Sequence, residues 1–350
     1  MTGMFEGKRI LITGGTGSLG QALTRRLMTG AEGVPESVTV FSRDEAKQHY
    51  MRLAFMHRDA ATDEVIFENS RQRLRFKIGD VRDYSALARA VKGAHFIFGA
   101  AALKQVPSCE YFPWEATQTN VEGAVNLVRV ISELDLPVDT VVGISTDKAC
   151  KPVNVMGMTK AIQERVFIDG NLHRPGTRFL CARYGNVLAS RGSVVPLFLD
   201  QIAAGGPVTI TTADMTRFLL TLDDAVDTIF AAVRSGAAGD TYIPRCRSAK
   251  MTDLAEYLIG DRNVETVVTG IRPGEKIHEI LISEEEATRT QDGSEGYFAI
   301  RPMLPELAGP VEAPALVGEY SSSSSLMGAE ELGSFLRQKL PGAVAANHLA

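Results

Sequence analysis

The sequence has little cysteine and no long apolar run. Its four cysteines, at positions 109, 150, 181 and 246, are isolated, with no C-x-x-C pair and no histidine at ligand spacing. Neither a disulfide framework nor a zinc site is therefore expected, and no metal is assigned. The longest apolar runs, such as HFIFGAAAL at 95–103, are far shorter than the roughly 20 residues that cross a bilayer. No membrane association is expected.

An excess of basic charge is also missing. The formal net charge is -5 and the pI is near 5.8, which argues against a broad surface for nucleic acid but allows a local basic pocket for a small phosphorylated ligand. The opening MTGMFEGKRILITGG has neither the basic region nor the apolar region of a secretory signal. We therefore expect a cytoplasmic protein.

The first half of the chain alternates short apolar runs with longer amphipathic ones. RILIT (9–13), SVTVFS (37–42) and TVVGIST (140–146) are typical of buried strands, whereas QALTRRLMT (21–29) and EGAVNLVRVISEL (122–134) are typical of helices. Buried strands separated by helices indicate a parallel sheet covered on both faces. The sequence therefore predicts an α/β fold with a doubly wound parallel sheet of the Rossmann type.

The alternation breaks after about residue 190 into pieces punctuated by Gly and Pro. We expect a first domain over 1–190, with segments around 219–245 returning to it, and a smaller substrate-binding lobe over 191–310. Ligands of doubly wound sheets lie at the carboxyl ends of the strands, facing such a lobe. The remaining 311–350 are predicted to hold a mobile serine-rich loop at 321–325 and a last helix with its acids first and its bases last.

The stretch ITGGTGSLGQAL (12–23) joins the first predicted strand to the first predicted helix. Its glycines allow a tight turn and a close approach of the backbone to a pyrophosphate, which the free N–H groups of the helix start then bind. Because the motif opens an alternating α/β half, it predicts dinucleotide binding. The expected contacts are Thr13, Gly14, Thr16, Gly17, Ser18, Leu19 and Gly20.

The end of the second predicted strand bears on which dinucleotide is bound. Ser42, Arg43 and Lys47 suit the 2'-phosphate of NADP, although the adjacent Asp44 and Glu45 would suit NAD if the register differed. NADP is therefore expected, with NAD as the less favoured alternative. Further along the chain, we expect Asp80 and Val81 beside the adenine, and Ala100 and Ala101 on the nicotinamide side.

The glycine loop and STDKACKPVNVMGMTK (145–160) together resemble the extended short-chain dehydrogenase/reductases. That family pairs a Tyr-x-x-x-Lys motif with a Ser or Thr at the end of the preceding strand. The resemblance makes Thr146 the hydroxyl and Lys160 the lysine that holds the nicotinamide ribose, but Met156 stands where the tyrosine is expected. A thioether can neither give nor take a proton.

Asp147 and Lys148 bring two other ionisable groups to the same strand end. A carboxyl group beside an amine can serve as acid and base, because each shifts the titration of the other and burial can bring a lysine toward neutrality. A surface ion pair is the alternative. The pair coincides with the expected active centre, which favours the catalytic interpretation.

Further motifs narrow the resemblance. FSRDE, AALKQVPSCEYFP, TNVEGA, RYGNVLASRGSVVPLF, MTRFLLTLDDAV and RPGEKIHE are similar to those of the UDP-N-acetylglucosamine 4,6-dehydratases, above all the soluble capsular enzymes that invert C5. The resemblance covers most of residues 5 to 300 and includes members with Met in place of Tyr. It implies a lyase with recycled NADP that acts on a UDP-N-acetylhexosamine in surface-glycan or secondary-metabolite sugar synthesis, and a homo-oligomer, often a hexamer.

The resemblance also implies roles for single residues. Lys148 is the implied base at C5, Asp147 the acid that assists departure of the C6 hydroxyl, and Thr146 the group that holds the C4 oxygen. The acceptor of the C4 hydroxyl proton stays open between Lys148 and a water near Asp147. Cys109, which matches a cysteine of related enzymes, either reprotonates C5 or lines the pocket.

A second set of residues has the chemistry that a UDP-sugar requires, namely cations for the diphosphate and polar groups for the sugar and ribose. It consists of Lys104, Asn186, Arg191, Ser193, Arg217, Arg272 and Glu275. Three other functions stay open: a UDP-sugar 4-epimerase, a 5,6-dehydratase, and a non-catalytic NADP-binding regulator. The sequence leaves undecided which UDP-sugar is bound and the stereochemistry at C5.

Overall fold

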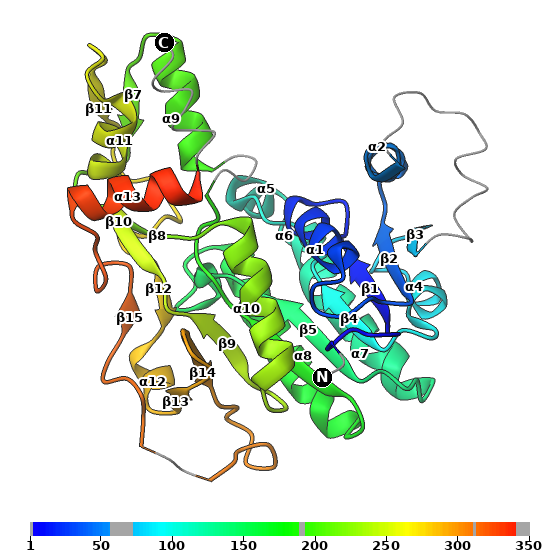
Figure 1. Ribbon diagram of the computed structural model, residues 1–350. Coiled ribbons are helices and arrows are strands. Elements are labelled where there is room, and N and C mark those ends of the chain that lie inside the picture. The colour runs from blue at the N-terminus through cyan, green and yellow to red at the C-terminus, as the bar shows by residue number, and fades with distance from the viewer. Residues whose placement is uncertain (1–2, 57–72, 189–192, 311–312, 341–350) are drawn as a thin grey trace.

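The computed structural model describes residues 3–56, 73–188, 193–310 and 313–340 (Figure 1). Its main body is a nine-stranded sheet with the order β13-β14-β9-β6-β5-β4-β1-β2-β3. The bounds are β1 Arg9–Thr13, β2 Ser37–Ser42, β3 Leu74–Ile78, β4 Phe96–Gly99, β5 Thr140–Ile144, β6 Arg178–Ala182, β9 Thr241–Pro244, β13 Thr290–Asp292 and β14 Tyr297–Ile300. In this sheet order, every neighbouring pair of strands from β9 to β3 is parallel, which confirms the predicted fold class.

Helices cover both faces of this sheet because its strands are apolar on both sides. Ile10 and Ile12 of β1 belong to one core cluster, whereas Leu11 between them belongs to another. The first cluster includes residues of α1 (Ser18–Thr29) and α10 (Leu222–Ser235), which pack together. The second includes residues of α4 (Tyr84–Val91), α7 (Gly123–Glu133) and α8 (Val155–His173).

A smaller lobe stands beside the carboxyl ends of the strands and has a core cluster of its own (Figure 1). It contains α9 Val194–Ala203, β7 Val208–Ile210, β8 Thr216–Leu219, β10 Arg247–Lys250, α11 Met251–Ile259, β11 Thr266–Val268 and α13 Ala329–Lys339. Two short ribbons, β10-β8 and β11-β7, tie these elements together. In α13, Glu330 and Glu331 stand in the first turn and Arg337 and Lys339 in the last, as the sequence predicts.

The remaining described elements are α2 Glu45–Met56, α5 Val106–Tyr111, α6 Pro113–Thr117, the π-turn Gln118–Glu122, the 3-10 turn Asp147–Ala149, β12 Ile280–Ile282, α12 Glu284–Ala287 and β15 Tyr320–Ser321. Strands β13 and β14 lie within 191–310, the range predicted for the smaller lobe. They pair instead at the edge of the main sheet. Two antiparallel strands thereby cap the exposed edge of a parallel sheet.

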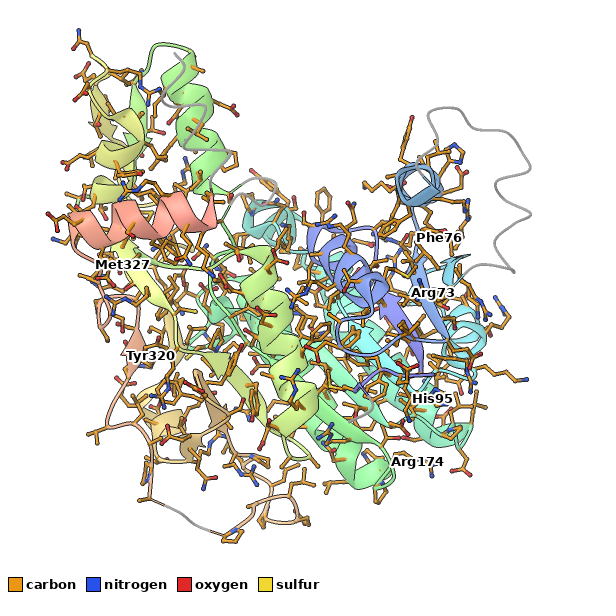
Figure 2. All side chains as sticks on the ribbon, viewed as in Figure 1. Arg73, Phe76, His95, Arg174, Tyr320 and Met327 are labelled. Atoms are coloured by element: carbon orange, nitrogen blue, oxygen red, sulfur yellow. The ribbon has the colours of Figure 1, made fainter. Side chains whose placement is uncertain are left out.

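The serine run corrects a second expectation, because the structure holds it in place. Ser321 lies in β15, which pairs with β12, and Ser322 is fully buried. The hydroxyl of Ser322 accepts a hydrogen bond from the Glu279 amide at 2.9 Å and donates to the Thr216 carbonyl at 3.2 Å. Tyr320 and Met327, labelled in Figure 2, flank this run in the sequence. The Tyr320 hydroxyl donates to the Cys246 carbonyl just before β10, and the Met327 amide donates to the Ser248 carbonyl within β10.

Across the described ranges, no helix combines the length and the apolar character needed to span a membrane.

Candidate functional site

The glycine loop between β1 and α1 has the close backbone packing that its sequence predicts. Gly14 has a φ of +65°, and a Cβ there would approach the Ala100 carbonyl to 2.7 Å, while a Cβ on Gly20 would collide with the Gly15 backbone. Only glycine fits such positions without a shift of the chain. Gly17 caps α1 without a side-chain hydrogen bond. The helix start therefore leaves backbone N–H groups for an anion, as a dinucleotide pyrophosphate requires.

Two other predicted cofactor segments lie beside this loop. The Ala101 amide donates to the Thr13 hydroxyl at 3.4 Å, and the Ala100 amide to the Thr13 carbonyl at 3.2 Å. Val81 is buried, and its carbonyl accepts from Asn126 at 3.1 Å. These residues fit a dinucleotide laid across the carboxyl ends of β1, β4 and the turn after β3.

The residues after β2 present two exposed cations. Arg43 Nη1 lies 3.6 Å from Asp80 Oδ2, and Lys47 Nζ lies 2.6 Å from Asp44 Oδ2. Both cations keep about half of their side chains exposed (53% and 54%), so a phosphate could reach them. Ser42 is buried, and its hydroxyl accepts from Gln48 at 3.0 Å.

Asp80 is bound from two sides. Arg82 donates to its carboxylate at 2.8 and 3.0 Å, and Arg43 approaches from the end of β2. Burial works against ionisation, but the arginines outweigh it, so the pKa of Asp80 lies below its usual range. The carboxylate is thus ionised and oriented at the predicted adenine side.

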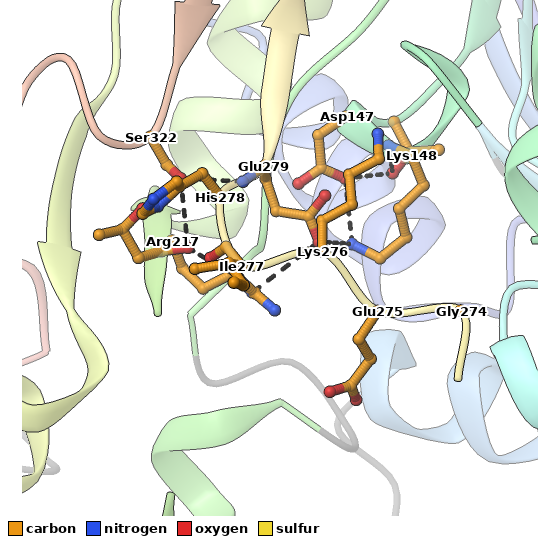
Figure 3. Close-up of polar contacts among 12 residues, drawn as sticks. Asp147, Lys148, Arg217, Gly274, Glu275, Lys276, Ile277, His278, Glu279 and Ser322 are labelled. Carbon is orange, nitrogen blue, oxygen red and sulfur yellow. Dashed lines mark hydrogen bonds and ion pairs between the residues drawn. The ribbon is translucent and has the colours of Figure 1, made fainter. Parts of the chain in front are cut away.

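The predicted acid/base pair lies at the carboxyl end of β5 (Figure 3). Asp147 is buried and accepts from the Thr146 hydroxyl at 2.8 Å and from Lys148 Nζ at 3.2 Å. Thr146 also caps the following 3-10 turn by accepting from the Lys148 amide. The structure therefore brings the three residues together, and the other Asp147 oxygen, Oδ2, is buried without a hydrogen-bond partner.

Glu279 is a member of this cluster that the sequence analysis did not select. Its Oε1 lies 2.9 Å from Lys148 Nζ and 3.8 Å from Arg217 Nε, and only 3% of its side chain is exposed. Arg217 also donates to the carbonyls of Thr216 at 2.7 Å and Ile277 at 3.0 Å. Glu279 is the last residue of the RPGEKIHE motif, and this motif is the sequence feature that could have pointed to it.

These contacts correct the expectation that burial brings Lys148 toward neutrality. Burial alone would lower the pKa of Lys148, but the charges of Asp147 and Glu279 outweigh it and raise that pKa instead. Burial raises the pKa of Asp147, against the attraction of Lys148 and with the repulsion of Glu279. For Glu279, Lys148 and Arg217 outweigh burial and lower the pKa. The cluster thus favours the charged forms of Lys148 and Glu279, whereas burial disfavours the charged form of Asp147.

Lys160 and Met156 both lie on α8 but face different surroundings. Lys160 is buried and donates to the Ile144 carbonyl and to Gln163, and burial lowers its pKa to about 8. Met156 packs with Cys109 in a small apolar cluster. Cys109 is fully buried, its thiol lies 3.7 Å from the Leu103 carbonyl, and burial raises its pKa. A raised pKa favours the proton-bearing thiol.

The residues predicted for the nucleotide end are spread along the mouth of the lobe. Lys104 and Arg272 are exposed, and Arg272 lies 4.0 Å from Glu275. Among the described residues, the side-chain oxygen of Asn186, the Ser193 hydroxyl and one Glu275 carboxylate oxygen are buried without a hydrogen-bond partner. Arg191 falls outside the described residues.

Asn154 ties the RPGEK loop to α8. Its Oδ1 accepts from the Gly157 amide at 2.8 Å and so caps the helix, while its Nδ2 donates to the Gly274 carbonyl at 2.8 Å. The loop is thereby held next to the helix that carries Met156 and Lys160. Within the described ranges, no group of three or more His, Cys, Asp or Glu side chains is arranged to hold a metal ion.

The strand order, the glycine loop and the second lobe define an extended short-chain dehydrogenase/reductase fold. Residues 10–301 match the family described as polysaccharide biosynthesis protein, and the chain belongs to that family.

Relatives and solved structures agree with this assignment. The chain is 42% identical over 294 residues to a UDP-glucose 4-epimerase of Rickettsia conorii, which covers 83% of this chain and 82% of the relative. The structure of Pen from Bacillus thuringiensis has a TM-score of 0.83 at 30% identity and covers 96% of this chain and 98% of its own. DesIV, a dTDP-glucose 4,6-dehydratase from Streptomyces venezuelae solved with NAD and TYD, shares the fold, with a TM-score of 0.62 at 24% identity over 77% of this chain and 86% of its own.

Proposed function

We propose that the protein is an NADP-dependent UDP-N-acetylglucosamine 4,6-dehydratase that inverts C5 and yields a UDP-2-acetamido-2,6-dideoxy-4-hexulose. The observation that carries this proposal is the pairing of the buried Asp147 with the half-buried Lys148 at the end of β5, beside a helix on which Met156 replaces the expected tyrosine. A reaction confined to oxidation and reduction at C4 needs one group that accepts the C4 hydroxyl proton. Loss of water across C5 and C6 needs both an acid and a base.

The cofactor would be held by the glycine loop, with Arg43 and Lys47 at a 2'-phosphate and Lys160 at the nicotinamide ribose. When bound, NADP supplies the oxidation at C4 and the returning reduction at C6, so that none is consumed. Thr146 would hold the C4 oxygen through its hydroxyl, which already lies next to Asp147. A keto group at C4 acidifies the hydrogen at C5, and the remaining chemistry is proton transfer.

The contacts of Lys148 suggest a route for these protons. Before its amine can take the C5 proton, the ammonium must pass one proton on, and the ionised carboxylate of Glu279 is within reach at 2.9 Å. The electron pair left at C5 then forms the double bond to C6 as the C6 hydroxyl leaves. Asp147, whose pKa is raised, is the group suited to give that hydroxyl the proton that turns it into water.

The substrate's nucleotide would lie toward the second lobe. Arg217, which lies beside Glu279, and the exposed Arg272 would supply the cations that a diphosphate needs. The unpaired polar atoms of Asn186, Ser193 and Glu275 supply hydrogen bonds for a uridine ribose or base.

A UDP-sugar 4-epimerase is the second candidate, and the name borne by the Rickettsia relatives favours it. Such an enzyme would use the same oxidation at C4 and would return the hydride to the opposite face of that carbon. It would leave Asp147 and Lys148 with no proton to move at C5 or C6. The two candidates therefore predict different products from the same substrate.

The deciding experiment is incubation of the purified protein with NADP and UDP-N-acetylglucosamine in deuterated water, followed by mass spectrometry and NMR. Loss of water, a C6 methyl group and deuterium at C5 support dehydration. An isomer of unchanged formula shows epimerisation, and tight NADP binding without turnover contradicts both enzymes. Lys148→Ala should abolish deuterium uptake at C5, whereas Lys151→Ala, which removes an exposed lysine three positions away, should not.

A further inference from the structure

Glu279 reaches the acid/base pair from a distant part of the chain. It stands 131 positions after Lys148, yet its Oε1 makes the shortest polar contact of the Lys148 ammonium, at 2.9 Å against 3.2 Å for Asp147. Figure 3 shows both carboxyl groups next to the end of the Lys148 side chain. A cation placed between two carboxyl groups is held in position, and the negative charge of Glu279 favours its protonated form.

The backbone of Glu279 is also fixed, and by the serine run. The Glu279 amide donates to the Ser322 hydroxyl at 2.9 Å, and the Ser322 amide donates to the Glu279 carbonyl at 2.8 Å. The same hydroxyl bonds to Thr216, the neighbour of Arg217. One serine of the C-terminal segment thus joins the backbone of Glu279 to β8, the strand that carries Arg217.

The second carboxylate oxygen of Glu279, Oε2, is buried. It makes no hydrogen bond to any of the described residues, and the same is true of Asp147 Oδ2. A buried acceptor left unpaired costs free energy, which a stability role alone would not require. A carboxylate that receives a proton during a reaction has a use for such a free oxygen.

We propose that Glu279 is a positioning residue for the proton chemistry: it holds the Lys148 ammonium and governs when that group gives up its proton. This inference rests on the proposed function for its catalytic meaning but not for its electrostatics. The negative charge of Glu279 favours the protonated form of both neighbours. Replacing it by a neutral amide should therefore lower the pKa of Lys148 and the pKa of Asp147 together.

The test is Glu279→Gln in the full-length protein, with the Nζ of Lys148 observed by NMR in protein labelled with a heavy nitrogen isotope on lysine. The Lys148 signal is identified by its loss in Lys148→Arg. We expect the titration midpoint of Lys148 to fall by about one pH unit or more, the usual effect of losing an opposite charge at this distance. An unchanged midpoint overturns the proposal.

Activity provides the second readout, in whichever reaction the enzyme performs. We expect kcat to fall about a hundredfold with a KM within a few fold of the parent value, and both limbs of the pH profile of kcat to move to lower pH. A uniform loss of activity with both limbs in place would mean that Glu279 only supports the fold. Because the NMR titration needs no turnover, failure to dehydrate the sugar would contradict the proposed function and leave this inference standing.

Two further variants serve as controls. Glu284→Gln removes an exposed glutamate that follows β12 and pairs with Lys151. It should leave the titration midpoint of Lys148 and both limbs of the pH profile of kcat unchanged. Glu279→Asp keeps the charge but shortens its reach, so it should move the midpoint in the same direction by less. If Glu279→Gln does not fold, the aspartate variant carries the test, and an unchanged Lys148 midpoint in that variant contradicts the proposal.

Discussion

Arg183 and Glu286 form a bidentate ion pair in the interior, with nitrogen–oxygen distances of 2.7 and 2.8 Å. The same guanidinium binds Glu164 of α8 at 2.7 and 2.9 Å. Because Arg183 follows β6 and Glu286 lies in α12, the three side chains join the main sheet, the helix that carries Lys160 and the segment that follows Glu279.

Removal of the arginine should destabilise the protein strongly. Arg183→Ala leaves two buried carboxylates without their cation, which typically costs about 3–5 kcal/mol of the free energy of unfolding. Urea denaturation measures this loss. Arg129→Ala, which breaks an exposed pair with Glu133 on α7, is the matched control and should cost less than about 1 kcal/mol. Equal losses in the two variants would contradict the structural role of Arg183.

The same network predicts a pH dependence of stability. Arg183 outweighs burial and lowers the pKa of Glu286 to about 2. A carboxyl with a depressed folded-state pKa stabilises the protein fully above its unfolded value, and the stabilisation is lost as the pH falls through the folded-state value. We expect the difference in stability between the parent and Glu286→Gln to shrink from about pH 4.5 downward. A difference that stays constant to pH 3 would contradict this origin.

The glycine loop predicts a loss of dinucleotide binding on a minimal substitution. In Gly20→Ala the new methyl group collides with the Gly15 backbone, so the loop must move away from the pyrophosphate position. We expect the Kd for NADP to rise about tenfold or more, equivalent to about 1.4 kcal/mol, in isothermal titration calorimetry. Gly176→Ala meets nothing within 4 Å and should bind as the parent does. Unchanged affinity in Gly20→Ala would place the dinucleotide elsewhere.

The preference for NADP can be tested at Arg43. This side chain is half exposed and carries a single ion pair at 3.6 Å, which leaves it able to bind a 2'-phosphate. Arg43→Ala should weaken NADP about tenfold and NAD within a few fold, since only NADP carries that phosphate. Arg25→Ala, at an exposed position of α1, should change neither. Equal weakening of both dinucleotides would argue against a 2'-phosphate contact.

The sequence alone predicted the parallel sheet and the loop because both depend on local patterns. The buried strands appear in the sequence as apolar runs, and the loop appears as closely spaced glycines between a strand and a helix. Thr146, Asp147 and Lys148 are consecutive, so their meeting at the end of β5 followed from the position of one strand.

Contacts between distant segments could not be predicted in the same way. Glu279 meets Lys148 because β12 lies against the turn that follows β5, and it adds to the effect of Asp147 in raising the pKa of Lys148. The serine run has the composition of a loop, yet Ser322 finds buried backbone partners that no local pattern reveals. Strands β13 and β14 are short, and their place at the sheet edge depends on pairing with β9.

The apolar surroundings of Met156 have a consequence for oxidation. Methionine is readily converted to its sulfoxide and a cysteine thiolate to its sulfenic acid, but both reactions need access, and the second needs a deprotonated thiol. Met156 is 5% exposed and Cys109 is fully buried with a raised pKa. The two sulfur atoms beside the site are therefore shielded from peroxide, and the protein should tolerate oxidising conditions better than its sulfur content near the active centre would suggest.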